Sequence, residues 1–185
     1  MRKIIVLVLI SFVACKQKET PLTAQQIIDK SIIASGADKV ANAQIEFGFR
    51  DKEYAAVRDN GNFRLFRTFK DEKLGMVSDG ISNNGFERNV NGHLFKVADS
   101  MAVKYTSSVN SVHYFSVLPY GLNDKAVQKN LLPEVEIKSK QYYKVQISFS
   151  EEGGGEDFED VFIYWINKTS FKIDYLAYSF HVNGG

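Results

Sequence analysis

Histidine is the side chain best suited to acid–base chemistry near neutral pH, and the chain has three, His93, His113 and His181. None has a second His, Cys or carboxylate at the spacing of a metal motif such as His-x-x-x-His. His113 is the best placed, because polar side chains lie near it in the sequence. This candidate polar cluster consists of Asn110, His113, Tyr114 and Tyr120. Its members could act as acid–base groups on an exported small molecule, or His113 could be a hydrogen-bonded structural residue where a helix meets a loop.

A second candidate is an acidic segment around three successive glycines, residues 151–160. Its carboxylates would suit a hard cation such as calcium, and the weak candidate ligands are Glu156, Asp157 and Asp160. The EF-hand spacing is absent, and three glycines are too pliable for a rigid ligand cage. The glycines also lack the Lys-Ser/Thr and the helix start of a phosphate-binding loop. We therefore interpret the segment as a solvated hairpin loop and expect no metal and no cofactor.

Nucleophilic catalysis has little support in the sequence. A Gly-x-Ser-x-Gly motif is absent, and Ser108 and Ser111 have no evident His and Asp partners. Lys168-Thr169-Ser170 superficially resembles the segment around the Schiff-base lysine of deoxyribose-phosphate aldolases. That activity requires a (β/α)8 barrel of about 250 residues, whereas we read residues 168–170 as a turn between two strands. Aldolase chemistry is disfavoured, and no catalytic residue is predicted.

The amino-terminal residues predict export. Arg2 and Lys3 precede an apolar run over residues 4–14 that is too short to span a bilayer, so residues 1–14 are read as a signal peptide. Phe12-Val13-Ala14-Cys15 resembles a bacterial lipobox, relaxed as in lipoproteins of the Bacteroidetes. We expect an acylated Cys15 to anchor the protein in the outer membrane of the bacterial envelope, through a tether over residues 15–22. The alternative is a plain secretory signal cut after Ala14, which leaves a free thiol.

Length and composition predict one globular domain over residues 23–185. The chain has 185 residues, of which 44% are hydrophobic and 24% charged. Its 23 basic and 22 acidic side chains nearly balance, so the electrostatic attraction that drives binding to a phosphate backbone is missing. Nucleic acid is therefore not expected as a partner.

Helical signals open the domain, and strand signals follow. Thr23 and Gln26 form a capping-box pair and Gly36 a left-handed stop, which predicts a helix over residues 23–35 with a further turn at 38–41. Period-2 alternation and Asn-Gly turns predict hairpins in series from Ile45 to residue 97. Helical spacing predicts an insert or lid over residues 100–117. Strands are expected again at residues 134–138, 142–150, 161–167 and 171–182.

The strand over residues 161–166 is apolar on both faces, so it should be central and covered by the N-terminal helix. Large apolar side chains elsewhere would project from a curved sheet. The candidate ligand pocket comprises Phe47, Phe49, Phe63, Val112, Phe115, Phe149 and Tyr164. Either the helices fill this space as an ordinary core, or it accepts a lipid or another hydrophobic ligand.

The helix over residues 24–36, the meander of short strands and the strand over residues 162–168 resemble the LolA/LolB-like lipoprotein fold. Residues 108–115, 118–124 and 153–160 resemble more closely an uncharacterised family of flavobacterial lipoproteins of unknown function. The resemblance implies an α+β fold in which a strongly curved antiparallel sheet, an incomplete β-barrel, encloses a hollow that is lidded by helices and holds acyl chains in the LolA/LolB group. It also implies strands beyond residue 185, so that residues 171–182 would expose an unpaired edge.

Three functions stay open from the sequence. The first is a membrane-anchored protein that binds a lipid or other hydrophobic ligand, the second an enzyme acting on an exported small molecule, and the third a structural lipoprotein that binds another envelope protein. The apolar candidates favour the first.

Overall fold

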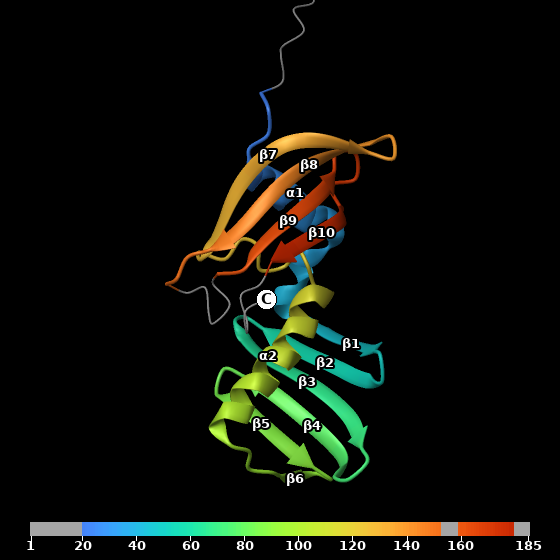
Figure 1. The fold of residues 1–185 in the computed structure, drawn as a ribbon, viewed down its shortest axis with the longest axis vertical. Coiled ribbons are helices and arrows are strands. Elements are labelled where there is room, and N and C mark those ends of the chain that lie inside the picture. The colour runs from blue at the N-terminus through green and yellow to red at the C-terminus, as the bar shows by residue number, and fades with distance from the viewer. Residues whose placement is uncertain (1–19, 153–158, 180–185) are drawn as a thin grey trace, which may run out of the picture.

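The computed structural model describes residues 20–152 and 159–179, which form two antiparallel sheets and two α-helices (Figure 1). The six-stranded sheet has the order β1-β2-β3-β4-β5-β6, and its strands are β1 (Gln44–Phe49), β2 (Lys52–Asp59), β3 (Asn62–Asp71), β4 (Gly75–Ser82), β5 (Gly85–Val90) and β6 (His93–Leu94). The four-stranded sheet has the order β10-β9-β8-β7, and its strands are β7 (Val127–Ile137), β8 (Lys140–Phe149), β9 (Val161–Asn167) and β10 (Ile173–Ser179). The predicted α+β class is confirmed.

Helix α1 (Ala24–Ser35) begins and ends where the sequence predicts. The Thr23 side chain accepts a hydrogen bond from the Gln26 backbone N–H, and the Gln26 side chain accepts one from the Thr23 N–H. Gly36 ends the helix at φ 70°, a left-handed conformation that glycine adopts without steric cost. The further predicted turn is also present, as the short 3-10 helix η1 (Ala37–Asn42).

Two Asn-Gly pairs make the tight turns of the meander. Asn60 and Gly61 join β2 to β3 and both have positive φ, as do Asn91 and Gly92 between β5 and β6. Two residues with positive φ match the right-handed twist of the strands that they connect. The predicted hairpins over the first half of the chain are therefore confirmed, although β6 is shorter than the predicted strand over residues 93–97.

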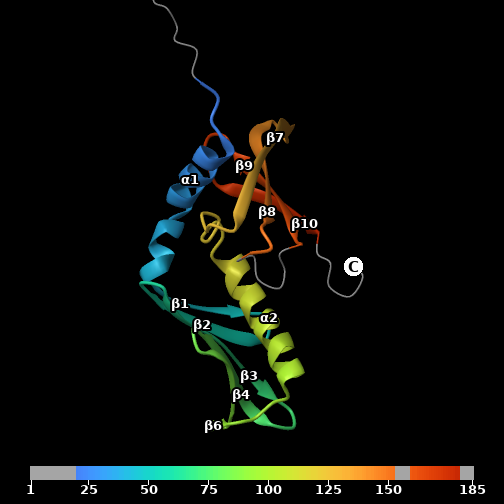
Figure 2. The same cartoon turned by 90° about the vertical axis from the view of Figure 1, so that its left-hand side faces the viewer.

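The strands do not form the one strongly curved sheet that we expected. They divide between two sheets, and no described strand of one sheet is hydrogen-bonded to a strand of the other. The division falls after β6, which has only two residues and so offers almost no backbone ladder for a further strand. The chain leaves this edge as helix α2 (Asp99–Ser116), and β7 starts a new sheet. Figure 2 shows the two sheets at opposite ends of an elongated molecule, with α2 running from one toward the other.

Helix α2 matches the predicted helical insert over residues 100–117. It packs across β3, β4 and β5, and its Val109 is fully buried against Ala56, Leu65 and Ile81. This cluster is the apolar core of the six-stranded sheet. The helix is therefore held by its own hydrophobic contacts on one face of that sheet.

The core of the four-stranded sheet confirms the prediction made for residues 161–166. Strand β9 lies between β8 and β10, and its Tyr164 and Ile166 are fully buried in one cluster with Ile27 and Ile28 of α1. The outer strand β10 exposes a row of side chains, including Tyr175 and Tyr178. Among the strands in the described ranges, β10 pairs with β9 alone, so it lies at the edge of this sheet.

Candidate binding cavity between the two sheets

Register alone aligns the side chains that face α2 into rows. The apolar row, Ile45–Ala56–Leu65–Ile81–Phe86, contains the partners of Val109. The neighbouring row is aromatic and charged and consists of Phe47, Tyr54, Arg67, Asp79 and Arg88. On the other side of the apolar row, toward the four-stranded sheet, Arg58 lies opposite Phe63.

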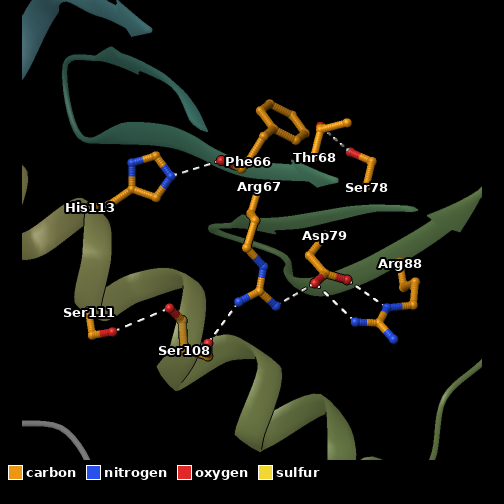
Figure 3. A network of polar contacts seen from close by, with 9 residues as sticks. All are labelled: Phe66, Arg67, Thr68, Ser78, Asp79, Arg88, Ser108, Ser111 and His113. Atoms are coloured by element: carbon orange, nitrogen blue, oxygen red, sulfur yellow. Dashed lines mark hydrogen bonds and ion pairs between the residues drawn. The ribbon is translucent and has the colours of Figure 1, made fainter. Parts of the chain in front are cut away.

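Asp79 binds two arginines beneath α2 (Figure 3). Its carboxylate is fully buried and accepts hydrogen bonds from Arg67 Nη2 at 2.6 Å, Arg88 Nε at 2.6 Å and Arg88 Nη2 at 3.0 Å. Arg67 also donates to Ser108 Oγ of α2 at 2.7 Å, and the Arg88 guanidinium lies 3.7 Å from the centre of the Tyr105 ring. The network therefore ties the helix to the sheet through charged groups. We interpret it as a structural element.

Our sequence analysis missed this network, although a signal for it exists. The turn at Asn83 and Asn84 pairs Ser82 with Gly85, and counting back from this turn places Asp79 opposite Arg88. Opposite charges at directly facing positions stabilise a strand pair. The hairpin prediction, extended by register, would have brought the two residues together.

His113 is held by α2 against β3 and two aromatic rings. Its Nε2 lies 3.0 Å from the Phe66 carbonyl oxygen, which can only accept, so Nε2 carries the proton and donates. The ring meets Phe47 and Tyr54 edge-on, with centroids 5.8 and 5.5 Å away. Burial lowers the pKa of His113, and the nearby charge of Arg58 lowers it further. The imidazole is therefore neutral at pH 7, and its Nδ1 is a buried acceptor without a hydrogen-bond partner among the described residues.

A cavity of about 380 Å³ lies where the two sheets approach each other. Strands β2 and β3, the last turns of α2, the loop over residues 118–126 and the facing ends of β7 and β8 contribute to it. Its apolar wall includes Phe63, Leu65, Val117, Val127 and Phe149. Its polar wall includes Arg58, Asn62, Asn110, His113, Tyr114, Tyr120 and Asp124.

All four members of the candidate polar cluster line this one cavity. Asn110, His113 and Tyr114 lie on the last two turns of α2, and Tyr120 lies in the loop that follows. Helical spacing thus brings together residues that the sequence already placed near each other.

Among the apolar candidates, Phe63 and Phe149 line the cavity and the other five do not. Phe47 stacks on Tyr54 at 5.2 Å, Phe49 is exposed on the edge strand β1, and Val112 is half-buried on α2. Phe115 and Tyr164 belong instead to an aromatic cluster around Phe162. The ring centroids of this cluster lie 5.6–6.1 Å from that of Phe162, and its members are Tyr114, Phe115, Phe149, Tyr164 and Tyr178.

Tyr114 connects the aromatic cluster to the cavity. Burial raises the pKa of its phenol, and burial together with neighbouring Tyr114 raises the pKa of Tyr164. Both hydroxyls are buried, and within the described ranges 20–152 and 159–179 neither has a hydrogen bond of good geometry. The Tyr114 hydroxyl, with Tyr164 as its neighbour, therefore stays protonated beside the cavity.

A larger groove of about 650 Å³ lies on the six-stranded sheet. It is lined mainly by side chains that alternate with those facing α2, such as Val57, Arg64 and Phe66, together with the turn at Asn83 and Asn84. The polar candidates do not line this groove, so we regard the smaller cavity as the candidate site.

Other sequence candidates lie elsewhere. Of the weak calcium ligands, Glu156 and Asp157 fall outside the described residues, as does Cys15. Within residues 20–152 and 159–179, no three His, Cys, Asp or Glu side chains are grouped to hold a metal ion. Lys168 lies in the predicted turn, where its Nζ pairs with Glu134 at 2.5 Å and lies over the Tyr143 ring. That ion pair is unlike the isolated, desolvated amine that Schiff-base chemistry uses.

None of the helices in the described part of the chain is long and apolar enough to cross a membrane. Fold and cavity define an α+β protein with two antiparallel sheets and a small, partly apolar cavity between them. The chain belongs to DUF6503, a family of unknown function, whose model matches residues 2–185. No curated protein and no solved structure matches the chain. The expected membership of an uncharacterised family is thus confirmed.

Proposed function

We propose that this protein is a lipoprotein of the bacterial envelope, anchored in the outer membrane through acylated Cys15, that binds a lipid or other hydrophobic ligand in the cavity between its two sheets. The observation that carries this proposal is the cavity wall, where the half-buried Phe63 and Phe149 leave apolar surface uncovered beside hydrogen-bonding groups. Each methylene that moves from water onto such a wall contributes about 0.8 kcal/mol. Binding sites for small molecules share this mixture of apolar walls and a few polar groups.

The size of the cavity limits the ligand. At about 380 Å³ it lies near the lower end of the ~300–1,000 Å³ that is usual for ligand pockets. A single apolar chain suits this volume better than a lipid with two acyl chains. We therefore favour a single-chain ligand, or one chain of a larger lipid.

The LolA/LolB-like half-barrel, with origin in the flavobacteria, remains part of the proposal. Antiparallel strands preceded by α1 and interrupted by α2 support it, since this is the element order that the resemblance implies. Because the strands form two sheets, we infer that the ligand-holding hollow of the half-barrel would be enclosed by both sheets and α2 together.

A second function, an enzyme acting on an exported small molecule, is favoured by one observation. His113, Tyr114 and Tyr120 line the same cavity, and the unprotonated Nδ1 of His113 has no hydrogen-bond partner within residues 20–152 and 159–179. A neutral imidazole nitrogen can accept a proton from a substrate. Replacing His113 by alanine separates the readings: loss of a turnover without loss of the fold supports an enzyme, and loss of stability alone supports a structural histidine.

Native mass spectrometry of the full-length protein, released from a non-ionic detergent, tests ligand binding. We expect an added mass from a co-purified ligand, or uptake of decanol or decanoate. Ala126→Phe, which fills the cavity from its loop wall, should reduce this uptake. Ala177→Phe on the exposed face of β10 is the matched control and should not. A wild-type protein that is ligand-free and takes up neither probe would contradict the proposal.

A further inference from the structure

Three arginines project from the six-stranded sheet toward α2, and they differ in their partners. Arg67 and Arg88 share the carboxylate of Asp79. Arg58, in the row nearer the four-stranded sheet, forms no ion pair and no side-chain hydrogen bond with any residue in the described ranges 20–152 and 159–179. Its positive charge is therefore uncompensated within this part of the chain.

Arg58 is also partly withdrawn from water. Its guanidinium lines the cavity and lies 5.6 Å from the centre of the Tyr120 ring. Its Nη1 is buried and has no acceptor in the part of the chain that the structure describes. Burial lowers the pKa of Arg58, opposed only by Tyr120, yet a guanidinium stays protonated at neutral pH. A buried donor on a charged group without an acceptor is costly, so the site favours any anion that can supply one.

The other titratable groups of the cavity leave room for such an anion. His113 on α2 is neutral, and Tyr114 keeps its proton, since burial raises its pKa. Asp124, in the loop, is the one carboxylate among the described lining residues. Its charge helps to raise the pKa of Tyr114, and together with Asp29 it opposes the lowering of the pKa of Lys129 by burial. Among the described residues, no carboxylate forms an ion pair with Arg58, so its guanidinium is available to an anion.

We propose that the ligand of this cavity is an amphiphile with one anionic head group, carboxylate or phosphate, bound by Arg58, and one apolar chain that lies against Phe63, Leu65 and Phe149. This inference rests on the proposed function and names the class of ligand. Arginine suits both head groups, because its planar fork can donate two parallel hydrogen bonds to either. The Tyr114 hydroxyl is a further donor for the same head group.

Four probes with the same chain test the head group: decanoate, decyl phosphate, decanol and decylamine. Each is titrated into the full-length protein in one non-ionic detergent, and occupancy is read by native mass spectrometry and by the shift in melting temperature. Decanoate or decyl phosphate, or both, should bind about ten- to a hundredfold more tightly than decanol, as expected for a hydrogen bond to a charged group. Decylamine should bind most weakly. The stronger of the two anions identifies the source of the head group.

Variants locate the charge that is responsible. Arg58→Gln and Arg58→Met should remove the preference for the anionic probes over decanol, each variant being compared with its own decanol binding, while Arg58→Lys should keep part of this preference. Arg64→Gln is the matched control, because Arg64 is an exposed arginine on the adjacent strand β3 that faces away from the cavity. It should keep the full preference.

The outcomes separate this inference from the proposed function. If neither decanoate nor decyl phosphate binds wild type more tightly than decanol, or if Arg58→Met keeps the preference for anions, the assignment of Arg58 is wrong while ligand binding stands. If no probe binds wild type, the proposed function itself fails. The comparison among probes on wild type needs no variant, so a misfolded Arg58 variant would not prevent the test.

Discussion

Replacing Asp79 by alanine should strongly destabilise the protein. The carboxylate is fully buried and accepts three hydrogen bonds from Arg67 and Arg88, each of which is only 7% exposed. Without it, two positive guanidinium groups face each other beneath α2 with no anion between them. Arg67, which donates a hydrogen bond to Ser108 of α2, also loses the carboxylate that holds it in place.

The expected loss is about 3–5 kcal/mol, the usual cost of removing one partner from a buried ion pair. Domains of this size have a total free energy of unfolding of ~5–15 kcal/mol, so the variant should retain only part of its stability. Replacing all three residues by apolar ones, as Arg67→Met, Asp79→Leu and Arg88→Met, should recover most of the loss, since a buried ion pair exchanged for well-packed apolar groups is often neutral.

Equilibrium unfolding in urea, followed by far-UV circular dichroism and by the fluorescence of the single tryptophan, Trp165, measures the change. Asp51→Ala is the matched control, because the Asp51 side chain is 77% exposed and pairs only with Lys52, so its removal should leave the midpoint almost unchanged. A loss below about 1 kcal/mol for Asp79→Ala would refute the reasoning, and so would a triple variant that is no more stable than the single one.

Two further predictions concern stability. Burial, aided by Arg58, lowers the folded pKa of His113 below 6.5, so the unfolded state binds more protons below that pH. The contribution of neutral His113 to stability should therefore be fully present above about pH 6.5 and be lost as the pH falls toward the folded pKa. Urea midpoints from pH 7 to 5 measure this loss, and the same dependence of the midpoint on pH in His113→Gln would contradict the prediction. Gly36→Ala places a side chain at φ 70° and should cost about 1 kcal/mol, read as a lower melting temperature; Gly48→Ala, at a glycine without positive φ, is the control for the helix stop.

Local sequence signals determined the elements of this protein. Thr23 and Gln26 start α1, Gly36 ends it, and the Asn-Gly pairs at residues 60–61 and 91–92 make hairpin turns, because each of these effects acts between residues a few positions apart. The apolar run over residues 161–166 likewise predicted a central strand. The structure buries one face of it, with Tyr164 and Ile166, and leaves the other face half-buried. The candidate polar cluster was found in the same way, since its four members lie within eleven residues of one another.

Only the tertiary structure decided how these elements combine. The strands divide into two sheets because β6 is too short to continue the ladder and α2 packs on the sheet that precedes it. Arg58 of β2 meets Tyr120 and the end of α2 about sixty residues later in the chain, and Phe149 closes the same cavity from the other sheet. Such contacts depend on which faces of the elements pack together. Which faces pack together depends on the apolar area buried over the whole chain, and this total cannot be read from a short segment.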